Sequence, residues 1–229
     1  MSKLDELIKE LCPNGVEYKS LGKYCKILKG KQLNKEKLLD FGLYPAYNGG
    51  ITCSGYTNDY NVNENTIIIS QGGASAGFVQ FITTKFWANA HCYYLKPNKE
   101  LLNNRFVYHF VKANQNKLME CQHGAGIPAL KASEIEKLQI PVPPIEVQRE
   151  IVRILDNFTE LTAELTAELT ARKKQYEHYR DSLLTFDNKV EWKTIKEVAD
   201  NFTGLTYKPE NVSTKGTLVL RSSNIQNNK

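Results

Sequence analysis

A glycine-rich run, GGASAG at residues 72–77, is the stretch whose composition best suits phosphate binding. A P-loop needs lysine and then serine or threonine directly after its last glycine, whereas Phe78 and Val79 follow here. The run also lacks the G-x-G-x-x-G spacing of dinucleotide-binding loops. We therefore expect a tight turn between two strands, in which the glycines allow another backbone to come close.

Histidine and cysteine could supply a metal site or a nucleophile, but their spacing supports neither. The histidines, His91, His109, His123 and His178, show no pattern such as H-E-x-x-H, and the five cysteines form no C-x-x-C pair. His91 and Cys92 are neighbours, but adjacent residues of a strand point to opposite faces. We expect no metal, no cofactor and no catalytic residue, and most of the cysteines buried, in a reducing compartment.

An independent amino-methyltransferase is also disfavoured. Such an enzyme holds its target base with an Asn/Asp-Pro-Pro-aromatic motif, and the Pro143-Pro144-Ile145 segment lacks both flanking residues. The N-terminal helical pattern carries acids and lysines, so it is not a signal peptide. Apolar runs such as residues 66–70 are too short to span a bilayer. We expect a cytoplasmic protein with no membrane contact.

Positive charge is concentrated near the N-terminus, although the net charge is only +5. Between Lys19 and Lys37 there are seven lysines against the single acid Glu36. A patch of this kind suits contact with a polyphosphate. The alternative is an ordinary solvated lysine face.

The order of the expected helices and strands predicts an α+β fold. Residues 1–144 are expected to form one mixed domain that positions these residues. Asn/Gly turns separate four segments typical of strands, at residues 44–51, 65–70, 77–83 and 91–97. The remaining segments are expected to be a helix at 3–11, a short strand or turn at 16–28, a helix at 101–119, a Gly/Pro loop at 124–131, a helical turn at 133–138 and a proline-rich lead-in at 139–144.

Residues 145–186 contain no glycine or proline and predict one long helix of about 60 Å. Apolar residues recur mostly in steps of three and four, which is the seam of a coiled coil. The seam comprises Val147, Ile151, Ile154, Phe158, Leu161, Leu165, Leu169, Tyr176, Tyr179 and Leu183. Such a helix acts as a spacer or a dimerisation element.

A tandem tetrapeptide, TAEL at 162–165 and 166–169, lies inside this helix. Each unit adds about 6 Å of length and about 40° of rotation, because four residues slightly exceed one turn. The two steps of four between Leu161 and Leu169 form a stutter that locally unwinds a supercoil. The repeat indicates a spacer whose length changes by whole units; the alternative is an ordinary amphipathic helix with chance repetition.

An internal repeat flanks the helix. VEYKSLGKYCKILKG at 16–30 aligns with VEWKTIKEVADNFTG at 190–204, at an offset of 174. Residues 187–229 are therefore expected to be the truncated start of a second copy of the first domain. Forty residues cannot bury a core of their own. The chain is expected to be slightly more than half of a two-copy protein.

This organisation resembles the specificity (S) subunit of type I restriction–modification systems. The resemblance covers nearly all of residues 11–229 and is strongest at LCPNGVEYKSLG (11–22), GAGIPAL to IPVPP (124–144), IEVQREIVRILDNFTELTAEL (145–165) and ARKKQYEHYRDSLL (171–184). Variable copies of TAEL are a known spacer device in this family. Residues 30–125 match only in general style, because the target-recognition sequence is hypervariable.

The resemblance implies a noncatalytic subunit. A full S subunit has two target-recognition domains, each reading half of a bipartite DNA sequence, and two antiparallel helices fix the gap between them. Methyltransferase (M) subunits dock on these helices, and restriction (R) subunits join outside. Because this chain stops before a second recognition domain, we expect a homodimer paired through residues 145–186 that binds an interrupted palindrome in double-stranded DNA.

Within such a role, polar and basic residues of the Gly/Asn-rich loops are the candidates for DNA contact. Lysine side chains would meet phosphates, at Lys29, Lys31 and Lys35. Amide side chains would bond base edges, at Gln32, Asn48, Gln71 and Asn89. Further candidates from neighbouring loops are Ser75, Lys85, Trp87, His91, His123 and Lys131. For each, the alternative is an ordinary turn or core residue.

A competing interpretation comes from another class of protein. The chain could be a noncatalytic coiled-coil adaptor or assembly protein whose globular domain binds protein rather than DNA. Salt-dependent binding to duplex DNA separates the two interpretations.

Overall fold

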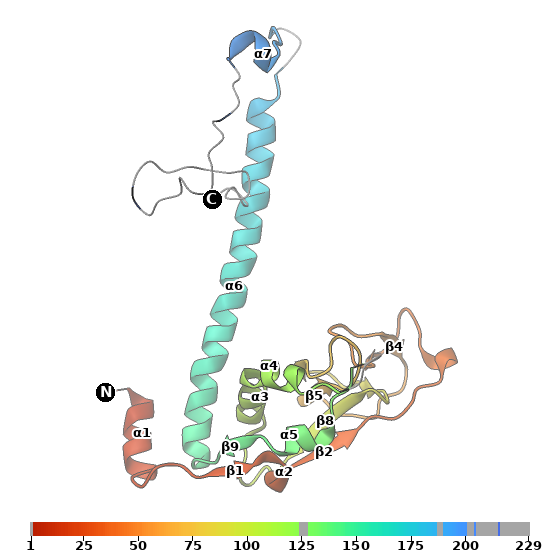
Figure 1. Cartoon of the computed structure of the whole chain (residues 1–229), viewed down its shortest axis with the longest axis vertical. Coiled ribbons are helices and arrows are strands. Elements are labelled where there is room, and N and C mark those ends of the chain that lie inside the picture. Colours follow the sequence, from red (N-terminus) through yellow and green to blue (C-terminus); the bar gives the residue numbers. More distant parts are fainter. Residues whose placement is uncertain (1, 124–127, 187–189, 201–203, 205–214, 216–229) are drawn as a thin grey trace. The chain divides into compact units, whose positions relative to one another are not determined.

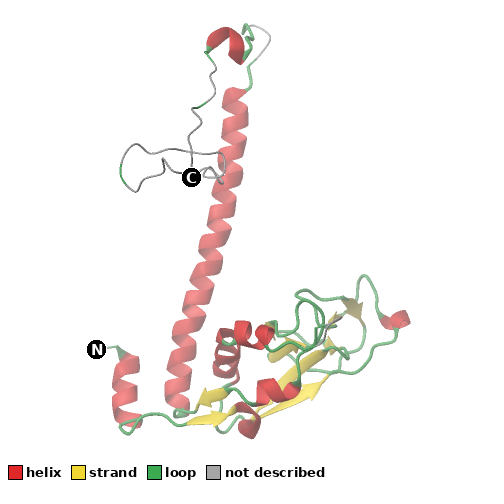
Figure 2. Ribbon diagram, in the orientation of Figure 1, coloured by secondary structure: helices red, strands yellow, loops and turns green. Residues whose placement is uncertain are grey.

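The computed structural model describes residues 2–123, 128–186, 190–200, 204 and 215. The chain divides into two units, Met1–Thr170 and Ala171–Lys229, and the boundary falls inside a long helix. Figure 1 labels most of the elements along the chain, and Figure 2 distinguishes helices, strands and loops.

A four-stranded antiparallel sheet forms the centre of the first unit. Its order is β2-β8-β5-β6, and these strands are Cys25–Lys29, Cys92–Pro97, Thr66–Ser70 and Val79–Ile82. The last three lie within segments expected to be strands, because each is an apolar run between Asn/Gly turns. The sequence left strand or turn open for residues 16–28, and pairing with β8 makes β2 a strand.

A smaller sheet has the order β4-β3-β7, with strands Gly55–Thr57, Tyr44–Tyr47 and Trp87–Ala88. β3 is antiparallel to β4 and parallel to β7. It occupies the first half of the strand expected at 44–51. The sequence did not predict β4 and β7, because strands of three and two residues carry too little alternation to be recognised. A 3₁₀ turn, η1 (Lys35–Lys37), lies between β2 and β3.

Both ends of the domain meet in a two-stranded sheet. The first helix, α1 (Lys3–Leu11), is capped by Ser2, whose side chain accepts from the Asp5 N–H. β1 (Tyr18–Ser20) then pairs with β9 (Gln139–Pro141), part of the proline-rich lead-in. The short helices α2 (Leu21–Tyr24) and α5 (Ala132–Glu136) follow β1 and precede β9.

Residues 101–119, expected to be helical, form two helices rather than one continuous helix. α3 (Asn104–Ala113) starts at the side-chain cap of Asn103, and α4 (Gln115–Glu120) follows directly. Asn114 separates them: its side chain donates to the Phe110 carbonyl at 2.9 Å. Asparagine favours such local bonds over continued helix, so the helix ends and a new one begins.

The central strand β5 is buried on both faces. Ile67 and Ile69 pack into the main core, which includes Val107 of α3, while Ile68 packs into a smaller core that includes Phe86. Alternate residues of a strand point to opposite faces, so helices cover one side of the sheet and the smaller sheet covers the other. The expected α+β domain with a long helix is confirmed.

The long helix α6 (Ile145–Leu184) is fastened to the domain by the buried side chain of Gln148. Gln148 is 0% exposed; its Oε1 accepts from the Asn103 N–H, and its Nε2 donates to the carbonyls of Leu101 and Pro143, each at 2.8 Å. Figure 1 shows α6 starting beside β1 and β9. A buried amide with three partners holds the first turns of α6 in one position.

A second attachment lies two turns further along α6. Asp156 accepts from both Nε and a terminal nitrogen of Arg105 and lies 2.6 Å from His109 Nε2. The Arg105 guanidinium also stacks on the rings of Phe81 and Tyr108, at 4.5 and 4.9 Å. Partial burial alone would raise the pKa of Asp156, but the hydrogen bonds and charges of Arg105 and His109 lower it below its usual value.

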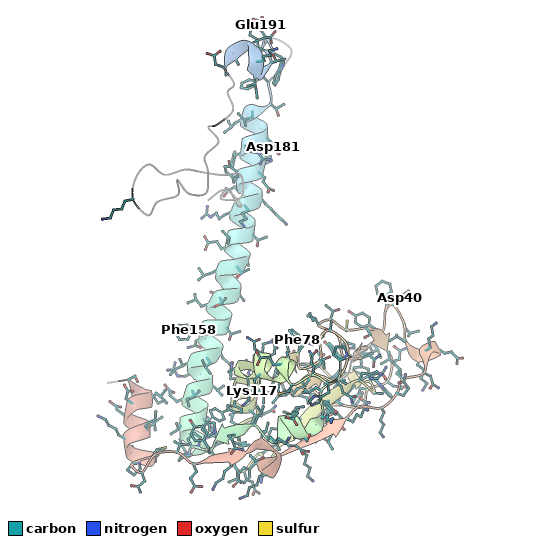
Figure 3. The ribbon with its side chains drawn as sticks, viewed as in Figure 1. Asp40, Phe78, Lys117, Phe158, Asp181 and Glu191 are labelled. Atoms are coloured by element: carbon teal, nitrogen blue, oxygen red, sulfur yellow. The ribbon has the colours of Figure 1, made fainter. Side chains whose placement is uncertain are left out.

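The seam of α6 changes its surroundings along the helix. Val147 is buried and Ile151 packs on the main core of the domain, so the first seam residues contact their own domain. Beyond them the seam is exposed: Phe158 is 64%, Leu161 49%, Leu165 57% and Leu169 56% exposed. Phe158 projects from α6 in Figure 3.

The second unit contains a short helix at the position that the internal repeat predicts. α7 (Ile195–Val198) lies 174 residues after α2, the same offset as the sequence repeat, and starts at a capping box of Thr194 and Glu197. Of the expected second copy, residues 187–189, 201–203, 205–214 and 216–229 lie outside the described residues.

Replacing Gln148 with leucine should lower the free energy of unfolding by about 2–4 kcal/mol, because one N–H and two carbonyls would be buried without partners. Urea unfolding followed by tryptophan fluorescence measures this. A Trp192→Phe background leaves Trp87 of the first unit as the only tryptophan, since the chain has two. The matched control, Gln175→Leu on the exposed part of the same helix, should change the value by less than about 0.5 kcal/mol.

Replacing Asp156 with asparagine should destabilise the domain more at neutral pH than at acid pH. A carboxyl with a lowered folded pKa stabilises the fold above its unfolded pKa, and this stabilisation disappears as the pH falls through the folded value, here below 3.8. Urea midpoints from pH 7 to pH 2, in a His109→Gln background that removes the neighbouring titration, test this. A difference between the two proteins that is the same at both pH values would contradict it.

Candidate nucleic-acid interface

The loops that carry most candidate residues meet at one end of the two sheets. They follow β2, β3 and β5 and precede β8, and the ends of β2, β5 and β8 concerned are brought together by the antiparallel register. Figure 2 shows loops gathered at the end of the domain remote from α6. Loops held by a rigid sheet are the usual place for binding residues.

Asn89 holds three of these loops together. It is 6% exposed; its Oδ1 accepts from the Leu33 N–H at 3.1 Å and the Ala90 N–H at 2.7 Å, and its own N–H donates to the Tyr47 carbonyl at 2.9 Å. Both lone pairs of Oδ1 are used within the chain. This placement favours a positioning role over the base contact expected from the sequence.

The segment after β2 is held against β7 and β8 by its backbone. The Gly30 N–H donates to the Cys92 carbonyl and the Lys31 N–H to the Ala88 carbonyl, both at 2.9 Å. The Trp87 indole donates to the Lys31 carbonyl at 2.9 Å, so Trp87 braces this loop. A Cβ at Gly30 would lie 2.2 Å from the Asn89 carbonyl oxygen, so only glycine allows this approach.

As a result, Lys29, Lys31 and Gln32 lie at the loop end with exposed side chains. The Gln32 side-chain Nε2 donates to the Leu33 carbonyl at 3.0 Å, and its side-chain oxygen takes no part in this hydrogen bond. The lysine-rich segment as a whole is not one patch. Lys19 pairs with Glu17 at 2.6 Å and Lys37 with Asp59 at 3.2 Å, outside this cluster.

A small cavity of about 230 Å³ opens at this end, lined by Asn48, Gly72, Gly73 and His91. The Gln71 N–H donates to the His91 carbonyl at 2.9 Å, and the Ser70 hydroxyl donates to the Gly49 carbonyl, which joins the three loops. A Cβ at Gly73 would meet nothing within 4 Å, so the glycine backbone is open here. The cavity therefore presents an amide, an imidazole and uncovered backbone together.

The segment around residues 123 and 128–131 adds a fourth side to the cluster. His123 and Ala129 exchange backbone hydrogen bonds of 2.9 Å, and the Leu130 N–H donates to the Gln71 carbonyl at 2.8 Å. His123 and Lys131 are exposed beside Gln71. Part of the expected Gly/Pro loop, residues 124–127, lies outside the described residues.

Three candidates lie apart from the cavity. Lys85 sits 4.7 Å from the centre of the Tyr60 ring and lines a different cleft. Lys35 lies in η1, and Ser75 lies in the turn after Gly73, where its carbonyl accepts from the Phe78 N–H. The glycines of that turn do allow close approach, but of the protein's own chain: a Cβ at Gly77 would lie 2.8 Å from the Met119 nitrogen.

Sequence reasoning missed Asn61. Its Nδ2 donates to the Ala88 carbonyl at 2.9 Å and its Oδ1 accepts from the Ala88 N–H at 2.7 Å, so one side chain replaces a strand partner for β7. The surrounding NDYNVNENT segment is rich in asparagine, and nothing in the order of its residues distinguishes this one.

The buried thiols at the two ends of the central sheet, Cys92 near the cavity and Cys25 at the opposite end, are poor nucleophiles. Burial raises the pKa of Cys92 and of Cys25 to about 12, so both stay protonated at neutral pH. Cys92 is buried while its neighbour His91 is exposed, in line with opposite faces of a strand. Among the described residues no group of three or more histidine, cysteine, aspartate or glutamate side chains is placed to hold a metal ion. No helix in the described part of the chain is long and apolar enough to cross a membrane.

Residues 13–172 match the family model "Type I restriction modification DNA specificity domain", which covers most of the chain. The protein therefore belongs to this family, which confirms the resemblance seen in the sequence.

Individual relatives of known description support the same family assignment. The chain is 36% identical over 189 residues to a putative type I restriction enzyme specificity subunit of Haemophilus influenzae, covering 76% of this chain and 48% of the relative. It is 35% identical over 223 residues to a type I restriction enzyme specificity subunit of Escherichia coli, covering 90% of this chain and 54% of the relative. The chain thus spans about half the length of these curated relatives.

Solved structures give the same result for the fold. The crystal structure of a type I restriction–modification S subunit from M. genitalium matches with a TM-score of 0.62 at 25% identity, over 76% of this chain and 47% of that chain. The HsdS subunit from Thermoanaerobacter tengcongensis shares the fold, with a TM-score of 0.54 at 18% identity over 72% of this chain and 44% of that chain.

Proposed function

We propose that this protein is a noncatalytic specificity subunit of a type I restriction–modification enzyme and reads one half of a bipartite DNA sequence. The observation that carries the proposal is the convergence of the loops after β2, β3 and β5 with the one before β8 around Asn48 and His91, in a chain of the DNA-specificity family. Acting on genomic DNA, it would work in the cytoplasm.

The candidate residues at the loop end fall into two groups, those suited to phosphates and those suited to base edges. The exposed ammonium groups of Lys29, Lys31 and Lys131 flank the cavity and suit phosphates, which position a protein on DNA without carrying sequence information. Asn48 and His91 offer exposed donors and acceptors suited to base edges, whereas the Gln71 side-chain oxygen is buried within the fold. This division assigns sequence preference to the cavity and general affinity to its rim.

Replacing Asn48 or His91 with alanine should raise the dissociation constant for the cognate half-site by roughly 5- to 150-fold, because removing one base contact costs about 1–3 kcal/mol. The half-site can be taken from the methylation pattern of host DNA, and binding measured by fluorescence anisotropy at several salt concentrations. Asn116→Ala, an exposed asparagine on α4, serves as the matched control. Salt-independent or absent duplex binding by the unaltered protein would favour the protein-binding adaptor instead.

We also propose that α6 pairs with α6 of a second copy, so that two half subunits read an interrupted palindrome. The seam from Phe158 onward supports this, because a row of half-exposed leucines and aromatic residues on one helix face calls for a partner helix. Methyltransferase and restriction subunits would then assemble around the paired helices. The TAEL units would set the gap between the half-sites, at about 6 Å for each unit.

The double substitution Leu161→Glu/Leu165→Glu should convert a dimer to a monomer, because four carboxylates would face one another across the seam. Sedimentation velocity over a range of concentrations measures this. Ala167→Glu, on another face of the same helix, should leave the dimer intact. A monomeric unaltered protein at micromolar concentration would refute the homodimer while leaving half-site binding untouched.

A further inference from the structure

A second basic surface lies at the opposite end of the central sheet from the cavity. It consists of two open clefts of about 920 and 510 Å³ that share Lys96, Pro97 and Asn98. We call it the rear basic face, and it carries five lysines: Lys23, Lys26, Lys85, Lys96 and Lys99. Sequence analysis placed Lys23 and Lys26 in one patch with Lys29 and Lys31, but β2 carries the two pairs to its opposite ends.

The strand register brings two of these charges together. Lys26 of β2 lies directly opposite Lys96 of β8, so their side chains emerge side by side on one face of the sheet. Like charges at directly opposed positions destabilise a sheet. A bound anion would remove that cost.

Carboxylates neutralise this surface only in part: Glu17 interacts electrostatically with Lys23, and Glu64 with Lys85. None of the ion pairs found among the described residues involves any of its five lysines. Three of them lie over tyrosine rings instead: Lys23 over Tyr24 at 5.4 Å, Lys85 over Tyr60 at 4.7 Å and Lys96 over Tyr94 at 5.8 Å. Glu64 is the one acid that lines the clefts in the described part of the chain. The exposed ammonium groups of Lys26, Lys96 and Lys99 therefore remain available to an external anion, whereas Lys85 is hydrogen-bonded to the Tyr60 side chain.

The residue types that line the rear basic face indicate which kind of anion it would bind. Lysines are compact charges on flexible stems and suit phosphates without demanding one geometry. The polar neighbours are mostly amides, including Asn63, Asn65 and Asn98. A protein interface would be expected to bring a core of aromatic residues, methionine and arginine, and to be depleted of lysine. The composition favours a polyphosphate backbone over an acidic protein surface.

The distance between the rear basic face and the cavity indicates which part of the DNA backbone this face would contact. Cys92 and Pro97 are the two ends of β8, and five residue steps at about 3.3 Å place the ends about 17 Å apart. For a duplex lying along β8, at about 3.4 Å per base pair, this equals roughly five steps. Phosphates at the rear basic face are therefore not those beside the bases at the cavity.

We infer that the rear basic face binds, without sequence preference, the sugar–phosphate backbone of duplex DNA flanking the half-site. This rests on the proposed function and extends it, because total affinity then depends on DNA that is not read. The occupant is the DNA backbone, and an acidic protein partner is the alternative that the experiment separates.

The test uses the full chain with the double substitution Lys26→Gln/Lys96→Gln and two duplexes. One carries the half-site with two flanking base pairs, and the other carries about ten more on each side. For the long duplex, the slope of log K against log salt should fall in magnitude by about 1.8, or about 0.9 for each phosphate that the variant no longer neutralises. Binding of the short duplex should not change. The double variant should be at least as stable as the unaltered protein, because a like-charge pair is removed.

The matched control neutralises two exposed lysines elsewhere on the same domain, Lys117 and Lys137, and should leave both slopes unchanged. Unaltered protein that binds both duplexes with one affinity and one slope overturns the inference alone. A double variant that keeps the long-duplex slope but loses affinity for the isolated methyltransferase subunit overturns it in favour of an acidic protein partner. Unaltered protein that binds neither duplex overturns the proposed function, and the inference with it.

Discussion

The buried amide of Gln148 is the interaction on which the rest of the arrangement depends. The long helix α6 has little apolar surface to bury against the domain beyond its first turns, since its seam is exposed from Phe158 onward. Its placement therefore rests on a few specific contacts near its start. Gln148 fixes the first turns, and Asp156 with Arg105 fixes the helix again further along. Two attachments at separate points along a rigid helix fix the direction of its first turns relative to the domain, whereas a single attachment would not.

At the other end of the domain, residues of the same chemical type have different roles. Asn89 and Asn61 use their side chains to hold backbone segments together, whereas Asn48 lines an open cavity. Lysines divide in the same way: Lys31 projects from the loop end, and Lys26 faces Lys96 at the opposite end of the sheet. The function of an asparagine or lysine in this domain is set by which strand end it occupies.

This explains how far the sequence could predict the structure. The strands β5, β6 and β8 and the helix α6 were predicted, because apolar runs and helical periodicity are local signals. The strands β4 and β7 could not be, because they are short and exist through pairing with β3, which is distant in sequence from β7. The break at Asn114 depends on one side-chain bond. The cavity residues were named individually, but their convergence, and the exclusion of Asn89 and Lys85 from it, follow from non-local register.

The partners of Gln148 have a consequence for how such a domain can vary. All three of its hydrogen bonds go to main-chain atoms, at Leu101, Asn103 and Pro143, and none goes to a side chain. The socket that receives α6 is thus made of backbone shape. Any recognition sequence that folds with the same turn at 101–103 presents the same socket, whatever side chains its loops carry. The attachment of α6 to the domain does not depend on the side chains of the recognition loops. The loop sequence, and with it the binding preference, can therefore change while the attachment of α6 stays the same.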